Sequence, residues 1–253
     1  MNELQEKTVL EHISDMRKFL LFAIALLLLG WLCGYALYPK IIVYLLAPLR
    51  TAGVHAGAAR SLAALSVFEG FLLRVKASFV SGIVLFVPLH IVNIFIFIGP
   101  ALKKREKRVF FFSVAAGSLL AVLAVLYSYR WIIPLSISFL TSPHFLPSQT
   151  GLLLAVGKNA MYIMQFLLAG VLVFQLPVVV CALLAAGLVT VNQVLSASRF
   201  VILGAFVFAA ILTPPDVLSQ ILLALPLIIL YYISAGIGFL FRSRKDDEKA
   251  GED

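Results

Sequence analysis

Several runs of about 20 residues carry no charged side chain, and this feature constrains the fold more than any other. An α-helix rises about 1.5 Å per residue, so each run matches the roughly 30 Å hydrocarbon core of a bilayer. Hydrophobic residues make up 62% of the chain and charged residues 13%, which leaves no stretch with the composition of a soluble domain. The sequence therefore predicts an all-α, polytopic membrane protein.

The apolar runs divide into six expected transmembrane helices. Residues 159–198 contain no formal charge, so they hold either one span or a hairpin of two. We expect one, because the run has no internal turn signal and Gln175 and Pro177 interrupt it as a kink does. The fifth run is short, which predicts a locally thinned bilayer, and Pro214-Pro215 separates it from the sixth. The expected spans are 19–38, 77–98, 109–133, 161–187, 200–213 and 218–241.

Lysine and arginine gather in the cytoplasmic loops of membrane proteins, so their distribution indicates the topology. Six spans place 13 of the 20 on the side that holds both termini, together with the dense basic loop at residues 99–108. Seven spans would move that loop to the side with fewer basic residues. The first apolar run also lacks the flanks of a cleaved signal peptide. We expect a cytoplasmic segment 1–18, a membrane domain 19–241 and a charged cytoplasmic tail 242–253, with outer loops at roughly 39–76 and 134–158.

The acidic residues indicate what the chain does not do. Between residues 16 and 245 the only ones are Glu69, Glu106 and Asp216, and none is near the centre of an expected span. A proton or cation transporter usually needs an intramembrane carboxylate. The sequence also lacks a carboxylate pair within a span, a histidine cluster and a nucleophile or phosphate-binding motif, so we expect no enzyme, no cofactor and no metal site. The basic residues are not interleaved with exposed aromatic residues, which argues against nucleic acid as a partner.

A series of ordered motifs covers almost the whole chain. They enter or leave the expected spans and consist of short polar or proline-containing segments. They are Glu11-His12-Ile13-Ser14-Asp15-Met16-Arg17, Ala47-Pro48-Leu49, Ser66-Val67-Phe68-Glu69 with Lys76, Phe97-Ile98-Gly99-Pro100 with Glu106-Lys107-Arg108, Phe174-Gln175-Leu176-Pro177 and Thr213-Pro214-Pro215-Asp216-Val217-Leu218-Ser219-Gln220. In residue type, order and spacing this set resembles the TatC family, the core receptor of the twin-arginine protein translocase.

The resemblance implies a concave bundle of six helices in the bacterial cytoplasmic (inner) membrane. It also implies a receptor for folded proteins whose signal peptides carry consecutive arginines, with export driven by the proton-motive force. Partners implied in the same way are single-span proteins of the TatA and TatB type and further copies of the receptor in a multimeric complex. A membrane scaffold without cargo would fit the hydropathy equally well, and only the motifs separate it from a receptor.

The resemblance further implies a signal-peptide site on the cytoplasmic side. Carboxylates bind guanidinium groups through paired hydrogen bonds that lysine cannot reproduce, so Asp15 and Glu106 are the expected ligands of the arginine pair. The same surface is expected to include the following neighbours: Arg17, Phe97, Lys107 and Arg108. Each carboxylate has a structural alternative, because Asp15 also suits the first turn of a helix and Glu106 offsets neighbouring cations.

A second set of residues is implied to form a cavity or to dock partner helices. Gln175 stands where the family has a glutamate, and its neutral amide alternatively satisfies carbonyls freed by Pro177. Asp216 alternatively caps the sixth span. The docking set comprises Gln175, Pro177, Thr213, Pro214, Pro215 and Asp216. Three further residues are expected to support the structure: Pro48, Glu69 and Lys76. Glu69 can do so by capping a helix, by pairing with Arg74 or Lys76, or by holding the outer loops together. The lone His90 is expected to form a hydrogen bond within the bundle.

Overall fold

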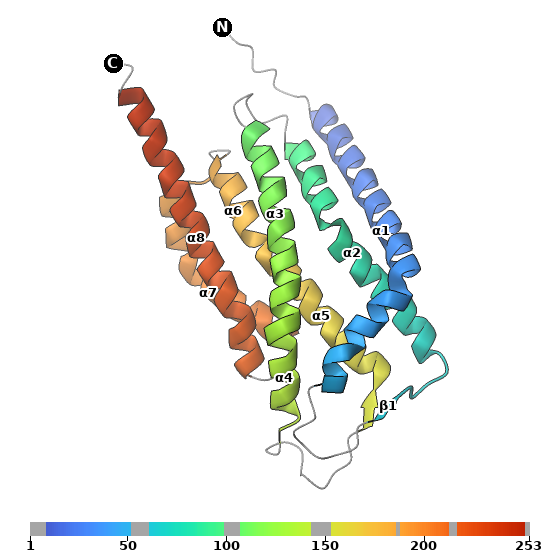
Figure 1. The fold of residues 1–253 in the computed structure, drawn as a ribbon. Helices are drawn as coiled ribbons and strands as arrows, with labels where there is room; N and C mark the ends of the chain where they lie inside the picture. The colour runs from blue at the N-terminus through green and yellow to red at the C-terminus, as the bar shows by residue number, and fades with distance from the viewer. Residues whose placement is uncertain are drawn as a thin grey trace.

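The computed structural model describes residues 9–51, 61–98, 107–142, 153–185, 188–212 and 217–250. Six of its helical segments are long and apolar enough to cross a membrane, and they run from 14 to 49, 69 to 97, 114 to 140, 156 to 184, 191 to 211 and 217 to 239. The all-α class and the six spans predicted from the sequence are therefore confirmed. Figure 1 shows the helices standing side by side, with the start of the first and the end of the last at the same end of the bundle.

The described residues form one domain, which consists of helices and two short strands. The two strands form a single parallel pair. The elements are α1 (Val9–Thr51), β1 (Ser61–Ala63), α2 (Glu69–Ile98), α3 (Lys107–Tyr127), η4 (Ser128–Ile132), α4 (Ile133–Leu140), β2 (Leu153–Ala155), α5 (Val156–Phe174), α6 (Leu176–Ala185), α7 (Val191–Leu212) and α8 (Val217–Ala250).

Helix α1 extends well beyond the expected span of residues 19–38. Pro39 and Pro48 lie inside it, and neither proline ends the helix. Proline bends a helix when packing holds the turns on both sides, and α1 changes direction along its second half in Figure 1. Leu45 and Leu49 on that half are only 4% and 2% exposed. The expected outer loop at 39–76 is therefore wrong for residues 39–51 and 69–76, which are helical.

The third span contains an unexpected π-helix, η4, between α3 and α4. Pro134 follows it in the first turn of α4, where the proline ring has no N–H to donate and crowds the carbonyl one turn earlier. The wider π turn absorbs that conflict and lets the helix continue to Leu140. The expected loop at 134–158 is consequently helical at its start.

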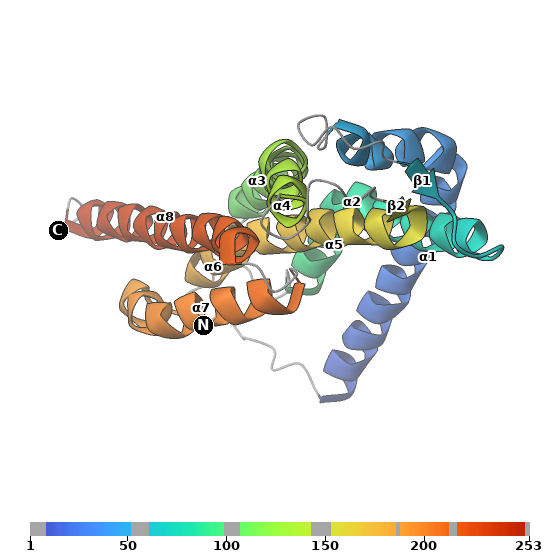
Figure 2. The same cartoon turned by 90° about the horizontal axis from the view of Figure 1, so that it is seen from below.

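The fourth span is interrupted once, at Gln175, where α5 ends and α6 begins. This is the place at which Gln175 and Pro177 predict a kink. Helix α5 is central in the view of Figure 2, and several of its side chains are fully buried. These are Ile163, Met164, Phe166 and Val171.

Helix α7 begins nine residues before the expected start at residue 200 and is 22 residues long. At about 1.5 Å per residue it reaches about 33 Å, so the helix itself is not short. Its polar start is stabilised by a reciprocal cap, in which the Thr190 backbone N–H donates to Gln193 Oε1 and the Gln193 N–H donates to Thr190 Oγ1. Only the apolar part of α7 that follows Arg199 is short. Helix α8 also extends beyond its expected span, because it continues to Ala250 through most of the expected cytoplasmic tail.

Helices α1 and α2 approach each other through small residues. A Cβ added at Gly34 would lie 2.1 Å from the carbonyl oxygen of Ser78, and one added at Gly82 would lie 2.3 Å from that of Gly30. Small residues four apart on each helix permit backbones to pack this closely in a membrane, where van der Waals contact drives helix association. This contact places the start of α1 beside the end of α2.

Candidate functional site

The end of the bundle that holds the start of α1, the end of α2 and the start of α3 carries the first set of candidate residues (Figure 1). The rings of Phe19 and Phe97 lie with their centroids 4.9 Å apart. The Asn93 side-chain amide donates to the backbone carbonyl of Phe19 at 3.3 Å. Asp15 is one helical turn before Phe19, so these contacts position it near the end of α2.

Helix α1 begins at Val9, which places Asp15 in the second turn and leaves Glu11 in the first. The effect of a helix dipole on a carboxylate falls off within the first turn. The structural alternative for Asp15, that it stabilises the first turn of a helix, therefore does not apply. Arg17 on the same turn is exposed to solvent or headgroups.

Several candidates lie outside the described residues, namely Glu106 and the segment 213–216 with Thr213, Pro214, Pro215 and Asp216. Lys107 and Arg108 form the start of α3. The described residues that flank the segment 99–106, namely the end of α2 at Ile98 and the start of α3 at Lys107, both lie at this end of the bundle (Figure 1).

The opposite end of the bundle carries Glu69, whose carboxylate joins two segments far apart in the sequence. It accepts hydrogen bonds from the backbone N–H groups of Leu65 and Gly157, both at 2.5 Å. Gly157 is in the first turn of α5, so Glu69 supplies that helix with a cap from another part of the chain. A Cβ at Gly157 would lie 2.6 Å from Glu69 Oε1, which explains the glycine.

The strand pair next to this carboxylate strengthens the same connection. Residues Ser61–Ala63 of β1 pair in parallel with Leu153–Ala155 of β2, directly before α2 and α5. Of the three roles considered for Glu69, the geometry corresponds to holding the outer segments together. Neither strand was expected, because each is three residues long and has no periodic signal.

Arg74 does not pair with Glu69 in the structure. Its guanidinium carbon lies 4.1 Å from the centroid of the Tyr35 ring and 5.5 Å from that of Tyr38, so it joins α2 to α1 through cation–π contacts. Lys76 is exposed, whereas Pro48 is buried against the bundle.

Gln175 lies at the break between α5 and α6 and faces α3. Its Nε2 donates to the carbonyl oxygens of Gly117 at 3.3 Å and of Val171 at 3.4 Å. The Val171 carbonyl needs a donor because the Gln175 N–H turns to Leu172 instead. The Gln175 side-chain oxygen is buried and has no hydrogen-bond partner among the described residues. The side-chain amide of Gln175 thus provides a donor for the Val171 carbonyl at the helix break, and its own oxygen remains as an unused acceptor. Pro177, two residues farther on, is buried.

Two residues just after the Pro214-Pro215-Asp216 motif were missed as candidates. Ser219 Oγ donates to Ser136 Oγ, which is itself hydrogen-bonded to Tyr162 Oη, so a buried set of hydroxyls joins α8, α4 and α5. Gln220 Nε2 donates to the Phe206 carbonyl of α7 at 3.0 Å. The motif continues through Ser219-Gln220 in the sequence, and that continuity was the available signal. For His90 the expected hydrogen bond is not seen at Nε2, which is buried without a partner in the described part of the chain.

Comparisons with known proteins agree with the six-span fold. The family model of the Sec-independent protein translocase protein (TatC) matches residues 11–226. The TatC protein of Aquifex aeolicus (strain VF5) is 31% identical over 241 residues, covering 95% of this chain and 98% of that protein. The TatC protein of Magnetococcus marinus (strain ATCC BAA-1437 / JCM 17883 / MC-1) is 26% identical over 252 residues, covering 98% and 90% respectively.

Solved structures extend the agreement to three dimensions. A crystal structure of the twin-arginine translocase receptor TatC in DDM superposes with a TM-score of 0.79 at 29% identity, covering 90% of this chain and 99% of that one. The resemblance inferred from the motifs is confirmed, and the chain belongs to the TatC family of Sec-independent protein translocase proteins.

Proposed function

We propose that this protein is the receptor of a twin-arginine translocase and binds twin-arginine signal peptides of folded precursor proteins. The observation that carries the proposal is the contact between Phe19 and Phe97, because it brings Asp15 of α1 to the end of α2 that leads into Glu106. The family membership supports the assignment, since its members are components of a protein translocase.

Recognition rests on carboxylates in a basic surrounding. Asp15 and Glu106 accept paired hydrogen bonds from the two guanidinium groups, whose planar geometry lysine does not share. The surrounding cations Arg17, Lys107 and Arg108 repel an arginine pair unless anionic headgroups neutralise them, so they favour recognition at a membrane surface. Phe97 adds an apolar contact for the residues that follow the arginines.

The basic end of the bundle faces the cytoplasm in this proposal. It holds most of the lysines and arginines by sequence, as the positive-inside rule requires, and the start of α1 and the end of α8 both lie there (Figure 1). The protein accordingly resides in the bacterial inner membrane with both termini in the cytoplasm. Signal peptides reach it from the compartment in which cargo folds.

Partner docking is proposed at two places along the bundle. Gln175 offers a buried carbonyl oxygen beside the break at Pro177, which suits a donor on a partner helix. The second place is the segment with Thr213, Pro214, Pro215 and Asp216, which follows α7 and precedes α8 in the sequence and lies outside the described residues. Single-span proteins of the TatA and TatB type, and further copies of the receptor, are the proposed partners, with the proton-motive force as the energy source.

The test is photo-crosslinking of a twin-arginine signal peptide to the membrane-embedded protein, with a twin-lysine peptide as the control ligand. We expect Glu106→Gln and Asp15→Asn to lower crosslinking, each by about tenfold if one charge-assisted hydrogen bond is lost. Glu69→Gln is the matched control, because it makes the same change at the opposite end. Equal losses in Glu106→Gln and Glu69→Gln, normalised to folded protein, would contradict the proposed site.

A further inference from the structure

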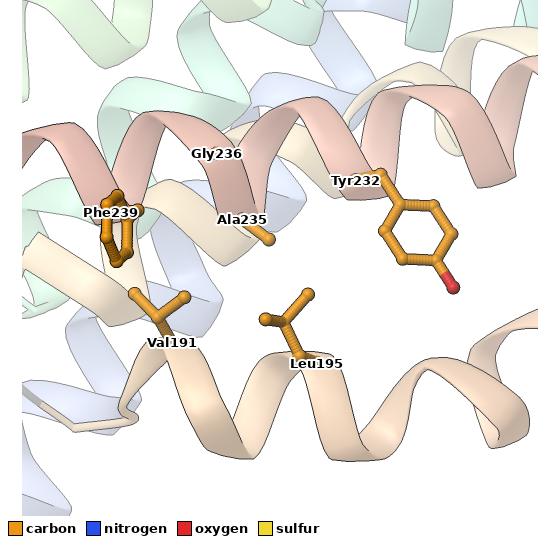
Figure 3. A pocket seen from close by; sticks show the side chains of 6 residues that line it. All are labelled: Val191, Leu195, Tyr232, Ala235, Gly236 and Phe239. Carbon is orange, nitrogen blue, oxygen red and sulfur yellow. The ribbon is translucent and has the colours of Figure 1, made fainter.

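The described surface has an apolar groove and a charged site, and only the charged site indicates what binds there. Figure 3 shows the groove, which is open between α7 and α8 and is apolar apart from one tyrosine hydroxyl. Its lining residues are Val191, Leu195, Tyr232, Ala235, Gly236 and Phe239. The charged site is formed by Arg74 of α2 where it meets two tyrosines of α1, at the end of the bundle that also holds Glu69.

The guanidinium group of Arg74 is held by aromatic rings. Its central carbon lies 4.1 Å from the centroid of the Tyr35 ring and 5.5 Å from that of the Tyr38 ring. Tyr35 and Tyr38 are three residues apart on α1 and so lie on the same face of that helix. Contact with two rings limits the orientations of the planar guanidinium, so it loses little conformational freedom when it binds an anion.

The guanidinium of Arg74 has no hydrogen-bond acceptor among the described residues. Its Nε is buried without a partner, whereas the two terminal nitrogens are accessible from outside the chain. Glu69 is the only acidic residue that the structure describes between residues 16 and 239, and its two oxygens already accept from the N–H groups of Leu65 and Gly157. A charge at the edge of the hydrocarbon core is costly without a counter-ion. An anion from outside the chain is therefore expected at the terminal nitrogens.

The depth of the site in the bilayer identifies the anion. Tyr38 follows the exposed Lys18 by 20 residues on α1, and about 30 Å of helix equals the thickness of the hydrocarbon core. Tyrosine is enriched where that core meets the headgroups. Lys40 and Lys76 are exposed, and each is two residues along its helix from the contact between Tyr38 and Arg74. The anion available at this depth is a phospholipid phosphate, and the two lysines favour a lipid of net negative charge.

We propose that this end of the α1–α2 contact binds one anionic phospholipid, whose phosphate accepts paired hydrogen bonds from the terminal nitrogens of Arg74. Tyr35 and Tyr38 position the guanidinium. One acyl chain runs toward the bilayer centre past Phe79, whose ring is 42% exposed and lies about 7.5 Å farther along α2. Phe79 contacts Trp31, which is one turn from Tyr35 on the same face of α1, so the path follows the same side of the two helices.

The lipid site is independent of the proposed signal-peptide site, because it lies at the opposite end of the bundle and requires only that the six helices span a membrane. In the orientation proposed above, its lipid belongs to the outer leaflet. A bound phosphate neutralises the buried guanidinium and so stabilises the contact between α1 and α2.

The test is native mass spectrometry of the full chain in detergent, titrated with phosphatidylglycerol and, separately, with phosphatidylcholine. We expect the first phosphatidylglycerol adduct to have the lower Kd. Arg74→Gln should raise that Kd about fivefold, the factor for one basic residue at a membrane surface. Arg130→Gln is the matched control and should leave the Kd unchanged, because Arg130 is exposed on η4 at a similar depth, about 34 Å along the helix from Lys107.

A second variant covers the possibility that Arg74→Gln alters the fold. Tyr35→Leu keeps the charge and an apolar side chain at a 40% exposed position, and it should raise the phosphatidylglycerol Kd about two- to fivefold because the guanidinium loses its nearer ring.

Four results would overturn the proposal. The first is equal phosphatidylglycerol affinity in wild type, Arg74→Gln and Tyr35→Leu. Equal losses in Arg74→Gln and Arg130→Gln would mean that the lipid responds to overall charge and not to a site. Displacement of the lipid by an equal concentration of inorganic phosphate would indicate a site for a soluble anion. Unchanged lipid binding with lost crosslinking of Arg74→Gln to a single-span partner would mean that a protein carboxylate is the counter-ion.

Discussion

The close approach of α1 and α2 makes Gly34→Ala the most informative single substitution. Its Cβ would lie 2.1 Å from the Ser78 carbonyl oxygen, and ordinary contact begins at 3.4 Å, so the helices must separate locally by about 1.3 Å. A gap of 0.5 to 1 Å already forfeits a quarter to a half of a dispersion contact. The obstacle is backbone and cannot rotate away as a side chain can.

We therefore expect a loss near the upper end of the range for overpacking, about 3 kcal/mol of unfolding free energy. Helix α2 is the main packing partner of α1, so few other contacts offset the separation. The same separation pulls Phe19 from Phe97 and moves Asp15 away from the end of α2, so signal-peptide crosslinking should fall as well.

Trp31 provides the assay, because its ring meets Phe79 edge-on across this interface with centroids 6.1 Å apart. In a Trp131→Phe background its fluorescence during a denaturing-detergent titration reports the α1–α2 contact. Gly204→Ala is the control, since no atom lies within 4 Å of its added Cβ and alanine favours a helix by about 1 kcal/mol. An equal unfolding midpoint for Gly34→Ala and Gly204→Ala would refute the packing argument.

Three further substitutions test other parts of the structure. Glu69→Gln should increase protease cleavage of the outer segments, because the amide has one acceptor oxygen where the carboxylate uses two, so the backbone N–H of Leu65 or of Gly157 loses its partner, whereas Lys76→Gln on the exposed side of α2 should not. Gln175→Leu should destabilise by about 1 to 3 kcal/mol, measured by thermal unfolding in detergent, because it removes the donor to the Val171 carbonyl, whose usual helical partner, the Gln175 N–H, bonds to Leu172 instead; unchanged stability would show that another donor replaces it. Thr190→Ala should cost about 1 kcal/mol and speed amide exchange in the first turn of α7, and equal exchange rates would mean that the cap contributes nothing.

Local composition was sufficient for the fold class and the number of spans. Transfer of a segment into lipid depends on the residues within that segment, so the uncharged runs predicted six helices without knowledge of their neighbours. Pro177 likewise acts on its own helix, and the break at Gln175 lies where it was predicted. The motifs identified the family because each is a short local pattern.

Helix boundaries were predicted less well, because they depend on what the ends meet. Pro39 and Pro48 are strong local signals for a loop, but burial of Leu45 and Leu49 keeps the chain helical through both. The spans expected from the sequence leave the polar residues before Arg199 in a loop between 187 and 200, yet the reciprocal cap of Thr190 and Gln193 starts a helix there.

The sequence by itself determined which segments enter the membrane and to which family the chain belongs. The tertiary structure alone decided which segments meet: Glu69 with Gly157, Gly34 with Ser78, and α7 with α8 around an open groove. The physical reason is the separation along the chain over which each interaction acts. Lipid solvation acts along each segment independently, whereas a hydrogen bond or a backbone contact forms only after residues far apart in the chain have been brought together.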